Sequence, residues 1–443
     1  MKESYNNRGL IAKQPYRLLT AGLTAILMAL SLHGYSQDLA RIGERSIIGT
    51  ARYVGMSGAM SAIGGDPTAA HDNVAGLGLY RHTEVLASIG YPSIFPQASV
   101  VLSIPHNTIS DEGVQYNNFM FSYRQLNGYA RTADVDGGIG YSLGKLIDDY
   151  GVGMDVDFCK DADNRSNSMW LRQIGYVNEY AFNWGINISN KWYVGAGIQV
   201  QSYRISDDAY YTETFDTQNA DGVNFSNENS TSLILSGVGC SFSTGLIYRP
   251  LSWLRLGVGL QTHSIGSLST YTTGTFYAQT DSLRASYAPD LGSRDGRERI
   301  MPLHLSTSVA FQIGAYGLIA LQYDYFHQFN STPQHSLRAG FEVIPVMGLY
   351  INAGYACESP FLKNDPVVPM DPTFDRQDTY YQYPKISHYA SVAVGYRGYY
   401  MLVQAAYQYR WQQLNLYAHE CAAPYELSAT THRVVLTIGW HRY

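Results

Sequence analysis

Apolar and polar residues alternate along several stretches of this chain, and no other feature restricts the possible folds as strongly. Along 192–201 one set of alternate positions is apolar and the other is mostly small or polar: the first is Trp192, Val194, Ala196, Ile198 and Val200, and the second is Tyr193, Gly195, Gly197, Gln199 and Gln201. The same division recurs along 254–261 and 401–410. Successive side chains of a β-strand point to opposite faces, so each stretch predicts a strand with one apolar face. Soluble antiparallel sheets and transmembrane barrels both carry this pattern, and both classes stay open here.

The N-terminal residues 1–36 have the composition of a secretory signal peptide. An apolar run covers 18–32, small residues follow at Gly34 and Ser36, and four basic residues precede the run: Lys2, Arg8, Lys13 and Arg17. The run is too short to cross a bilayer comfortably, so we expect a cleaved signal, with an uncleaved signal anchor as the alternative. Removing these four cations and Glu3 takes away a net +3, which changes the chain's net charge from −6 to −9. An acidic exported protein is a poor candidate for binding nucleic acid.

The remaining composition favours a membrane barrel over a soluble sheet protein. No second long apolar run follows residue 32, which excludes helical membrane spans. A barrel satisfies its backbone between strands and hides its hydrophobicity in the alternation. The chain also has 38 Tyr, a residue that gathers at both membrane interfaces because its ring is apolar and its hydroxyl polar.

Connection lengths predict the orientation of this barrel. Very short links between good strands occur at 189–191, 249–252, 315–316, 345–347 and 397–398. Short links are typical of periplasmic turns. The long polar links near 207–230, 279–299, 359–384 and 418–429 are then extracellular loops.

This frame predicts fourteen antiparallel strands. They are 82–91, 115–124, 136–145, 177–188, 192–206, 231–248, 253–277, 300–314, 317–328, 333–344, 348–357, 385–396, 399–417 and 431–443. We leave out 97–104, because a fifteenth strand would break the even count that puts both ends of the barrel in the periplasm. The last strand ends at Tyr443, an aromatic terminus of the kind that barrel-assembly machinery reads, although Tyr443 is one residue out of phase with the outward face of Val434, Leu436, Ile438 and Trp440.

The segment 49–81 differs from everything that follows it. It is rich in Gly and Ala and cannot build a core of its own, yet it has apolar anchors at Met56, Met60, Ile63, Val74 and Leu77. A flexible linker is one interpretation. We favour a plug (residues 37–81) that packs inside the barrel formed by 82–443.

This segment also resembles a known family. Its runs Gly64-Gly65-Asp66-Pro67 and Asn73-Val74-Ala75-Gly76-Leu77 resemble the N-terminal hatch of the FadL/TodX family of outer-membrane transporters for hydrophobic compounds. The family's hatch signature is Asn-Pro-Ala-Gly-Leu, and here Val74 replaces the Pro. Stretches 245–268 and 349–360 are similar to a mid-barrel hairpin and to a later strand of the family. The resemblance assigns Asn73, Ala75 and Gly76 to the hatch motif, with Leu77 as a packing residue, and Asn73 is suited to bonding backbone groups in a turn.

Other candidate sites carry little chemistry. Cys159, Cys240, Cys357 and Cys421 form no C-x-x-C pair, so the sequence predicts no metal site, and isolated thiols are expected although disulfides stay possible in an oxidising compartment. The acidic stretch 155–163 lacks the ligand order of a calcium loop and is expected to be a solvated loop. Glycine pairs such as Gly257 and Gly259 lie mid-strand, without the following helix that a dinucleotide site needs. His263 and Ser264 point to opposite faces of a strand and cannot act together as base and nucleophile, so we expect no enzyme.

The sequence therefore predicts an all-β, 14-stranded antiparallel transmembrane barrel with an N-terminal hatch in its lumen. Resemblance to the FadL/TodX family implies a monomeric channel in the outer membrane of a Gram-negative bacterium. It would take up hydrophobic compounds such as long-chain fatty acids or aromatic hydrocarbons by passive diffusion, without a cofactor. Outer-membrane lipid and the assembly machinery are the other expected partners. A secretion or surface-attachment shuttle with the same fold is the alternative.

Overall fold

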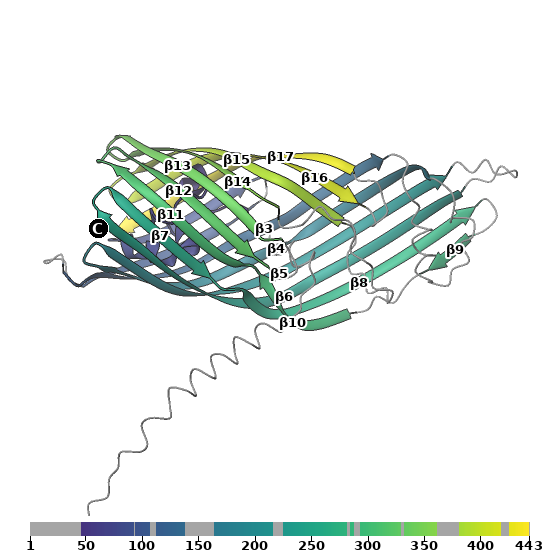
Figure 1. The fold of residues 1–443 in the computed structure, drawn as a ribbon, viewed down its shortest axis with the longest axis horizontal. Helices are drawn as coiled ribbons and strands as arrows, with labels where there is room; N and C mark the ends of the chain where they lie inside the picture. Colours follow the sequence, from purple (N-terminus) through teal and green to yellow (C-terminus); the bar gives the residue numbers. More distant parts are fainter. Residues whose placement is uncertain are drawn as a thin grey trace, which may run out of the picture.

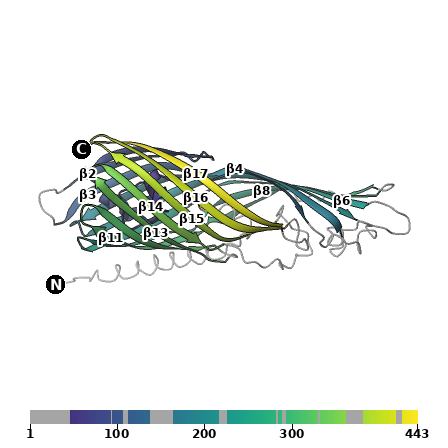
Figure 2. The same ribbon diagram turned by 90° about the horizontal axis from the view of Figure 1, so that it is seen from above.

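The computed structural model describes residues 46–92, 94–106, 112–137, 164–215, 225–280, 284–287, 293–328, 332–360, 381–417 and 425–442. In these ranges the chain forms one closed antiparallel β-barrel (Figures 1 and 2). No helix within them is long and apolar enough to span a membrane. Residues 1–45 and Tyr443 lie outside the described part of the chain, and with them the expected signal peptide and the terminal aromatic residue.

Seventeen strand segments make up the described sheet. They are β1 (Thr83–Tyr91), β2 (Gln97–Pro105), β3 (Val114–Gly137), β4 (Asn164–Ile188), β5 (Trp192–Phe215), β6 (Phe225–Leu251), β7 (Leu254–Gln261), β8 (Ser264–Thr280), β9 (Arg284–Tyr287), β10 (Ser293–Met301), β11 (Leu303–Ile313), β12 (Gly317–His327), β13 (Gln334–Val346), β14 (Leu349–Glu358), β15 (Tyr381–Arg397), β16 (Met401–Tyr417) and β17 (Tyr425–Arg442).

These segments occupy fourteen positions around the described wall, as predicted. Segments β7 and β8 share one position, because both pair with β6, and β10 and β11 share the next, because they pair with β8 and β7. Segment β9 pairs with the end of β8. Pairing of β1 with both β17 and β2 closes the barrel.

The count of fourteen was reached through two errors that cancel. Residues 97–104, left out on grounds of parity, are β2, whose Gln97, Ser99 and Val101 face inward in ordinary alternation. The predicted strand 136–145 is not a separate position of the wall, because 136–137 are the end of β3 and β3 pairs directly with β4; residues 138–145 lie outside the described part of the chain. Strand β3 has 24 residues, far more than the roughly 9–11 that cross a bilayer, so one strand was counted as two.

Two ends of the barrel differ in their connections. Short turns at 189–191, 252–253, 314–316, 347–348 and 398–400 lie at one end, the short-turn end, as predicted. At the other, long-loop end the strands run further than predicted: β5 continues to Phe215, β6 begins at Phe225, and β17 begins at Tyr425. Figure 1 shows β4, β5, β6 and β8 extending well past β11 to β14, so one side of the wall is much taller than the other.

Outward and inward faces follow the predicted alternation. On β5, Trp192, Ile198 and Val200 are exposed, whereas Tyr193 and Gln199 are buried. The last strand exposes its predicted outward face of Val434, Leu436, Ile438 and Trp440. The outer wall is therefore apolar and the inner wall is mainly polar, which is the arrangement of a membrane barrel.

The wall has two irregular places. Segments β7 and β8 are separated at Thr262 and His263, and the adjacent β10 and β11 are separated at Pro302, which has no N–H to give to the ladder. Elsewhere the short hairpin of β1 and β2 pairs with β17 only along Val434–Arg442 and with β3 only along Tyr116–Arg124. Residues 425–433 and 125–137 therefore continue past this hairpin toward the long-loop end, where the Tyr425 hydroxyl donates to Asn167 of β4.

Residues 46–82, called the N-terminal segment below, pack against the inner faces of these strands. The segment contains two short helices, α3 (Ala51–Gly55) and α4 (Ala69–Asp72), and the 3-10 helix η1 (Val74–Leu79). Its apolar anchors Met56, Met60, Ile63, Val74 and Leu77 are all at most 4% exposed. A segment too short to form its own core is thus buried by the wall, mainly by β4, β5 and β6 on one side and β14 to β17 on the other.

Candidate functional site in the barrel lumen

Glycines on the inner wall let the N-terminal segment approach the strands closely. A Cβ at Gly259 would overlap the carbonyl oxygen of Asp72, and one at Gly245 would overlap the side-chain oxygen of Asn73. The same holds, with other segment atoms, at Gly185, Gly195, Gly340 and Gly354, and a Cβ at Gly257 would lie 3.0 Å from Ala62 Cα. The mid-strand pair Gly257 and Gly259 therefore lies where the backbone of the segment touches the wall.

The predicted hatch motif forms one compact turn. Asn73 caps η1 by accepting a hydrogen bond from Ala75 N at 3.1 Å, and its amide donates to Ser61 O at 3.1 Å and Leu246 O at 3.3 Å. Val74, Ala75 and Leu77 are at most 1% exposed, and Gly76 lies against Gly64. Asn73 thus joins two parts of the segment and strand β6, which agrees with its suitability for bonding backbone groups.

A buried ionic cluster around Arg338 connects the segment to strands β11 to β14. The Arg338 guanidinium lies 3.0 Å from Asp324 Oδ2, 3.4 Å from Glu358 Oε1 and 3.5 Å from Asp72 Oδ2. It also donates to the Tyr53 hydroxyl at 3.1 Å, which itself donates to Asp72 at 2.7 Å. His304 Nε2 is 2.9 Å from Asp324 Oδ1. Two of these groups, Tyr53 and Asp72, belong to the segment, so the cluster holds the segment to the wall.

A second buried cluster, around Glu179, performs the same task on the opposite wall. Glu179 accepts hydrogen bonds from Arg124 Nε at 2.9 Å and Gln201 Nε2 at 2.9 Å. His71 of the segment places Nδ1 2.9 Å from Glu179 Oε1 and Nε2 3.1 Å from the Ser122 hydroxyl. Burial lowers the pKa of His71 below its ordinary value, with a further lowering by Arg124 that Glu179 partly offsets.

An apolar band lines the inner wall on the long-loop side of the Glu179 cluster. Its members come from adjacent positions of the wall, β3 to β6, β8 and β10, and are at most 4% exposed: Leu126, Val177, Tyr203, Ile205, Leu233, Leu235, Leu268, Ile300 and Met301. Val177 and Leu126 are two residues beyond Glu179 and Arg124 on the same strands. Apolar side chains on the inner face of a membrane barrel depart from the usual polar lining, and here they pack against one another as one buried apolar cluster.

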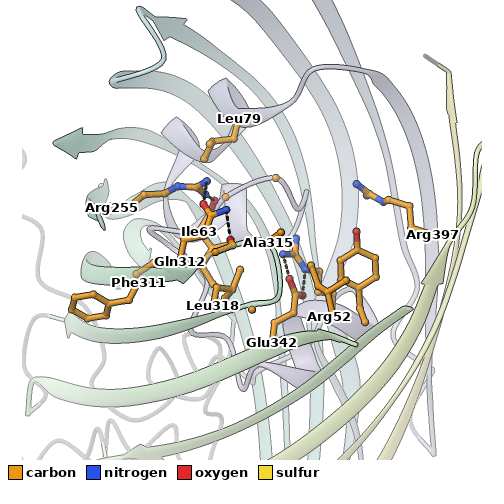
Figure 3. A pocket seen from close by; sticks show the side chains of 17 residues that line it. Arg52, Ile63, Leu79, Arg255, Phe311, Gln312, Ala315, Leu318, Glu342 and Arg397 are labelled. Atoms are coloured by element: carbon orange, nitrogen blue, oxygen red, sulfur yellow. Dashed lines mark hydrogen bonds and ion pairs between the residues drawn. The ribbon is translucent and has the colours of Figure 1, made fainter. Parts of the chain in front are cut away.

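A cavity of about 290 Å³ lies at the short-turn end, between the segment and the ends of strands β7 and β11 to β15 (Figure 3). Three arginines line it, Arg52, Arg255 and Arg397, together with apolar side chains such as Ile63, Leu79 and Leu318. In Figure 3, Arg255 reaches from the wall toward Ile63, and Arg52 pairs with Glu342.

Residues with other possible chemistry are not gathered into a site. Cys240 and Cys357 are free thiols on outward positions of β6 and β14, and Cys159, Cys421 and the acidic stretch 155–163 lie outside the described residues. Within the described ranges no group of three His, Cys, Asp or Glu side chains could hold a metal ion. Ser264 donates to Gln201 at 2.7 Å inside the barrel, whereas His263 accepts from Leu303 N at 3.2 Å in the break between β7 and β8.

No protein-family model matches the sequence, and no curated protein sequence is significantly similar to it. Solved structures are similar in fold. A FadL homologue from Pseudomonas aeruginosa superposes with a TM-score of 0.55 and 12% identity, over 90% of this chain and 99% of the homologue. The toluene transporter TodX from Pseudomonas putida gives a TM-score of 0.50 and 13% identity, over 89% and 98% of the two chains. The chain has the FadL fold.

The sequence analysis did not identify several residues that build the lumen of this FadL fold. Alternation places Arg338, Asp324 and Glu179 on inward positions, but it cannot show that they meet Tyr53, Asp72 and His71 across more than a hundred residues of chain. One signal was available. A charged residue on the inward face of a strand is costly unless paired when a plug fills the lumen and excludes water, so each of them marked a position that needed a partner.

Proposed function

We propose that this chain is a passive outer-membrane channel for hydrophobic compounds, such as aromatic hydrocarbons or long-chain fatty acids. The apolar band on the inner wall is the observation that carries the proposal, because a water-filled pore for polar solutes has no use for it. The solved structures of similar fold include a FadL homologue and a toluene transporter. The apolar outer wall fits a monomer surrounded by lipid in the outer membrane of a Gram-negative bacterium, inserted by the barrel-assembly machinery.

In this proposal three parts of the chain have different roles. Residues 1–36 direct export, residues 37–81 are the hatch, and residues 82–443 form the channel. Asn73, Val74, Ala75, Gly76 and Leu77 hold the hatch in its folded form. A solute enters among the extracellular loops at the long-loop end and passes along the apolar band toward the hatch.

Two exits are compatible with this path. Displacement of the hatch would open the lumen to the periplasm. The place where β17 residues 425–433 and β3 residues 125–137 run past the short β1–β2 hairpin would instead let an apolar solute leave sideways. Sideways release suits a hydrophobic solute, because the apolar membrane interior dissolves it better than water does.

The test is uptake of radiolabelled toluene and oleate by cells that lack their own transporters and express this chain. We expect uptake of at least one of them to exceed that of vector-only cells. Leu233→Gln and Leu235→Gln, in the apolar band, should reduce this uptake severalfold. Ile234→Gln, on the outward face of the same strand, is the matched control and should leave it unchanged. Equal uptake by all variants would contradict the route, and a stoichiometric protein partner in pull-downs without uptake would favour the shuttle.

A further inference from the structure

The cavity at the short-turn end has walls from two parts of the protein. Arg52, Ile63 and Leu79 come from the N-terminal segment, whereas Arg255, Leu318 and Arg397 come from the barrel. Apolar side chains and guanidinium groups face the same space (Figure 3). An interior that is part apolar and part cationic matches a small molecule with an apolar body and an anionic end.

The three arginines of this cavity differ in their partners. Arg52 forms a two-point ion pair with Glu342, at 2.6 and 2.9 Å, and Arg397 pairs with Glu84 at 2.9 Å. Arg255 donates Nη1 to Ile63 O at 3.0 Å and Nη2 to Gln312 Oε1 at 3.4 Å, and within the described residues no carboxylate lies in ion-pair distance of it. Within the described part of the chain, the cavity therefore has one uncompensated positive charge, that of Arg255.

The unused part of Arg255 is the edge that binds carboxylates best. Its Nε is buried and has no hydrogen-bond partner among the described residues, and the adjacent Nη2 makes only the long contact to Gln312. Arg52 uses the same Nε and Nη2 edge to hold both oxygens of Glu342. The Nε atom is closed to solvent in this structure. After a small turn of the Arg255 side chain, a carboxylate bound to this edge would satisfy the free donor and the excess charge together.

We propose that this cavity binds a small organic monocarboxylate, with the carboxylate on the Nε edge of Arg255 and the apolar body against Ile63, Leu79 and Leu318. Its volume of about 290 Å³ limits the body to a single ring or a short chain, since a cavity of about 150 Å³ holds benzene. A nucleotide or a folded peptide is too large.

Occupancy of this cavity has a consequence for the hatch. The ligand contacts both the segment and the wall, so it binds only while the segment is docked, and by mass action it stabilises the docked state. A carboxylate on the periplasmic side would therefore slow passage through the channel. The site stands without the proposed function, whereas this closing effect rests on it.

The binding test uses the purified mature protein in detergent, with benzoate as the probe and benzyl alcohol as its neutral counterpart, followed by titration calorimetry. We expect saturable benzoate binding and at least tenfold weaker binding of benzyl alcohol. Arg255→Gln should weaken benzoate binding at least tenfold, and Arg255→Lys should weaken it less. Arg249→Gln removes a nearby cation that does not line the cavity, so it should bind benzoate as the wild type does.

Variants that fail to fold are recognised by loss of heat-modifiable migration. Leu318→Trp is an independent test, because it fills the cavity and leaves Arg255 in place. Equal binding of both probes, or unchanged benzoate binding in Arg255→Gln or Leu318→Trp, would overturn the site. In the cell-uptake assay, benzoate in the medium should reduce the excess uptake of toluene or oleate over vector-only cells in the wild type but not in Arg255→Gln. Binding without slowing would overturn the closing effect alone. No excess uptake of toluene or oleate even without benzoate would count against the channel function and leave the site standing.

Discussion

The hydroxyl of Tyr53 donates a 2.7 Å hydrogen bond to Asp72, nineteen residues further along the N-terminal segment, and accepts one of 3.1 Å from Arg338 of the wall. This contact closes the segment on itself and attaches it to strand β13 in one place. Arg338 is also the only guanidinium among the described residues within ion-pair distance of Asp72, Asp324 or Glu358.

Replacing Arg338 by Met is expected to release the segment. The substitution leaves three buried carboxylates without their cation, and breaking a buried ion pair in this way costs about 3–5 kcal/mol. Hydrogen exchange of peptides covering 46–80 measures the docking, and heat-modifiable migration reports whether the barrel has folded. Arg338→Lys keeps the charge but not the planar fork, so its exchange should be intermediate. Slow exchange in Arg338→Met would show that the Glu179 cluster alone holds the segment.

Gly259→Ala is expected to loosen the segment, because the new Cβ would meet Asp72 and Asn73 of the segment and, on the wall, only the rotatable hydroxyl of Ser306. The new Cβ would overlap the carbonyl oxygen of Asp72, which belongs to backbone and cannot rotate away. Overpacking of this kind costs roughly 1–3 kcal/mol. The same exchange experiment applies, with Ala196→Val on the outward face of β5 as the control. Unchanged exchange in Gly259→Ala would mean that the segment can shift along the wall at no cost.

Much of the wall was predictable from the sequence, because alternation of apolar and polar side chains along a strand can be seen in the order of residues alone. Inward and outward faces of β5, β7, β16 and β17 follow the alternation, and so do the short turns. Strand ends were not predictable in the same way. Membrane thickness limits only the apolar part of a strand, and β3 to β6 continue beyond it with Thr, Ser, Asn and Asp side chains that also suit a loop.

The lumen was predictable only in outline. Small residues on inward positions indicated that another part of the chain packs against them, and the Gly- and Ala-rich composition of 49–81 indicated that this segment does so. The partners of individual residues depend on the register of a segment that has no periodic pattern, so the pairing of His71 with Glu179 or of Asp72 with Arg338 required three-dimensional information.

Substitutions in the hatch motif test whether the proline of the family's signature would fit at Val74. Val74 is the first residue of η1, directly after the cap Asn73, whose φ of −146° and ψ of 102° are extended. Proline is tolerated at the first helical position, and an extended residue suits the position before it. Val74→Pro should therefore change the free energy of unfolding by no more than about 1 kcal/mol. Asn73→Ala removes the cap and two further hydrogen bonds, and should cost roughly 0.5–2 kcal/mol. The midpoint of thermal unfolding ranks the two variants, and a larger loss for Val74→Pro would contradict this account of the turn.

Deleting Asp38 to Leu79 is expected to leave a barrel that inserts but leaks. The described strands from Thr83 to Arg442 pair with one another all the way around, and none of their ladder bonds comes from the segment. Inward charges such as Glu179 and Arg338 would then be hydrated instead of paired. Uptake of a small polar antibiotic measures the leak, and heat-modifiable migration confirms folding. A folded but tight deletion variant would show that the loops or the apolar band already close the lumen.

Docking of the segment is expected to weaken below about pH 6.5, because His71 has a lowered pKa when docked. Between the lowered value and about 6.5, a released His71 binds a proton that the docked one does not, so acid favours release by up to about tenfold per pH unit. Above that range the residue is neutral in both states and the effect disappears. Burial is the main cause of the lowered pKa of His71, Arg124 lowers it further, and Glu179 and Asp72, which also face the ring, partly offset this. Asp66 opposes this trend. Burial raises its pKa, although hydrogen bonds from Thr50 and Thr68 and the charge of Arg52 lower it in part, so protonation of Asp66 stabilises the docked state.

Comparison with His71→Gln isolates the contribution of the histidine. Hydrogen exchange of peptides 46–80, corrected for the intrinsic rate, should accelerate from pH 7.5 to 5.5 in the wild type and much less in the variant. An equal pH response in both would assign it to Asp66 or to the loops.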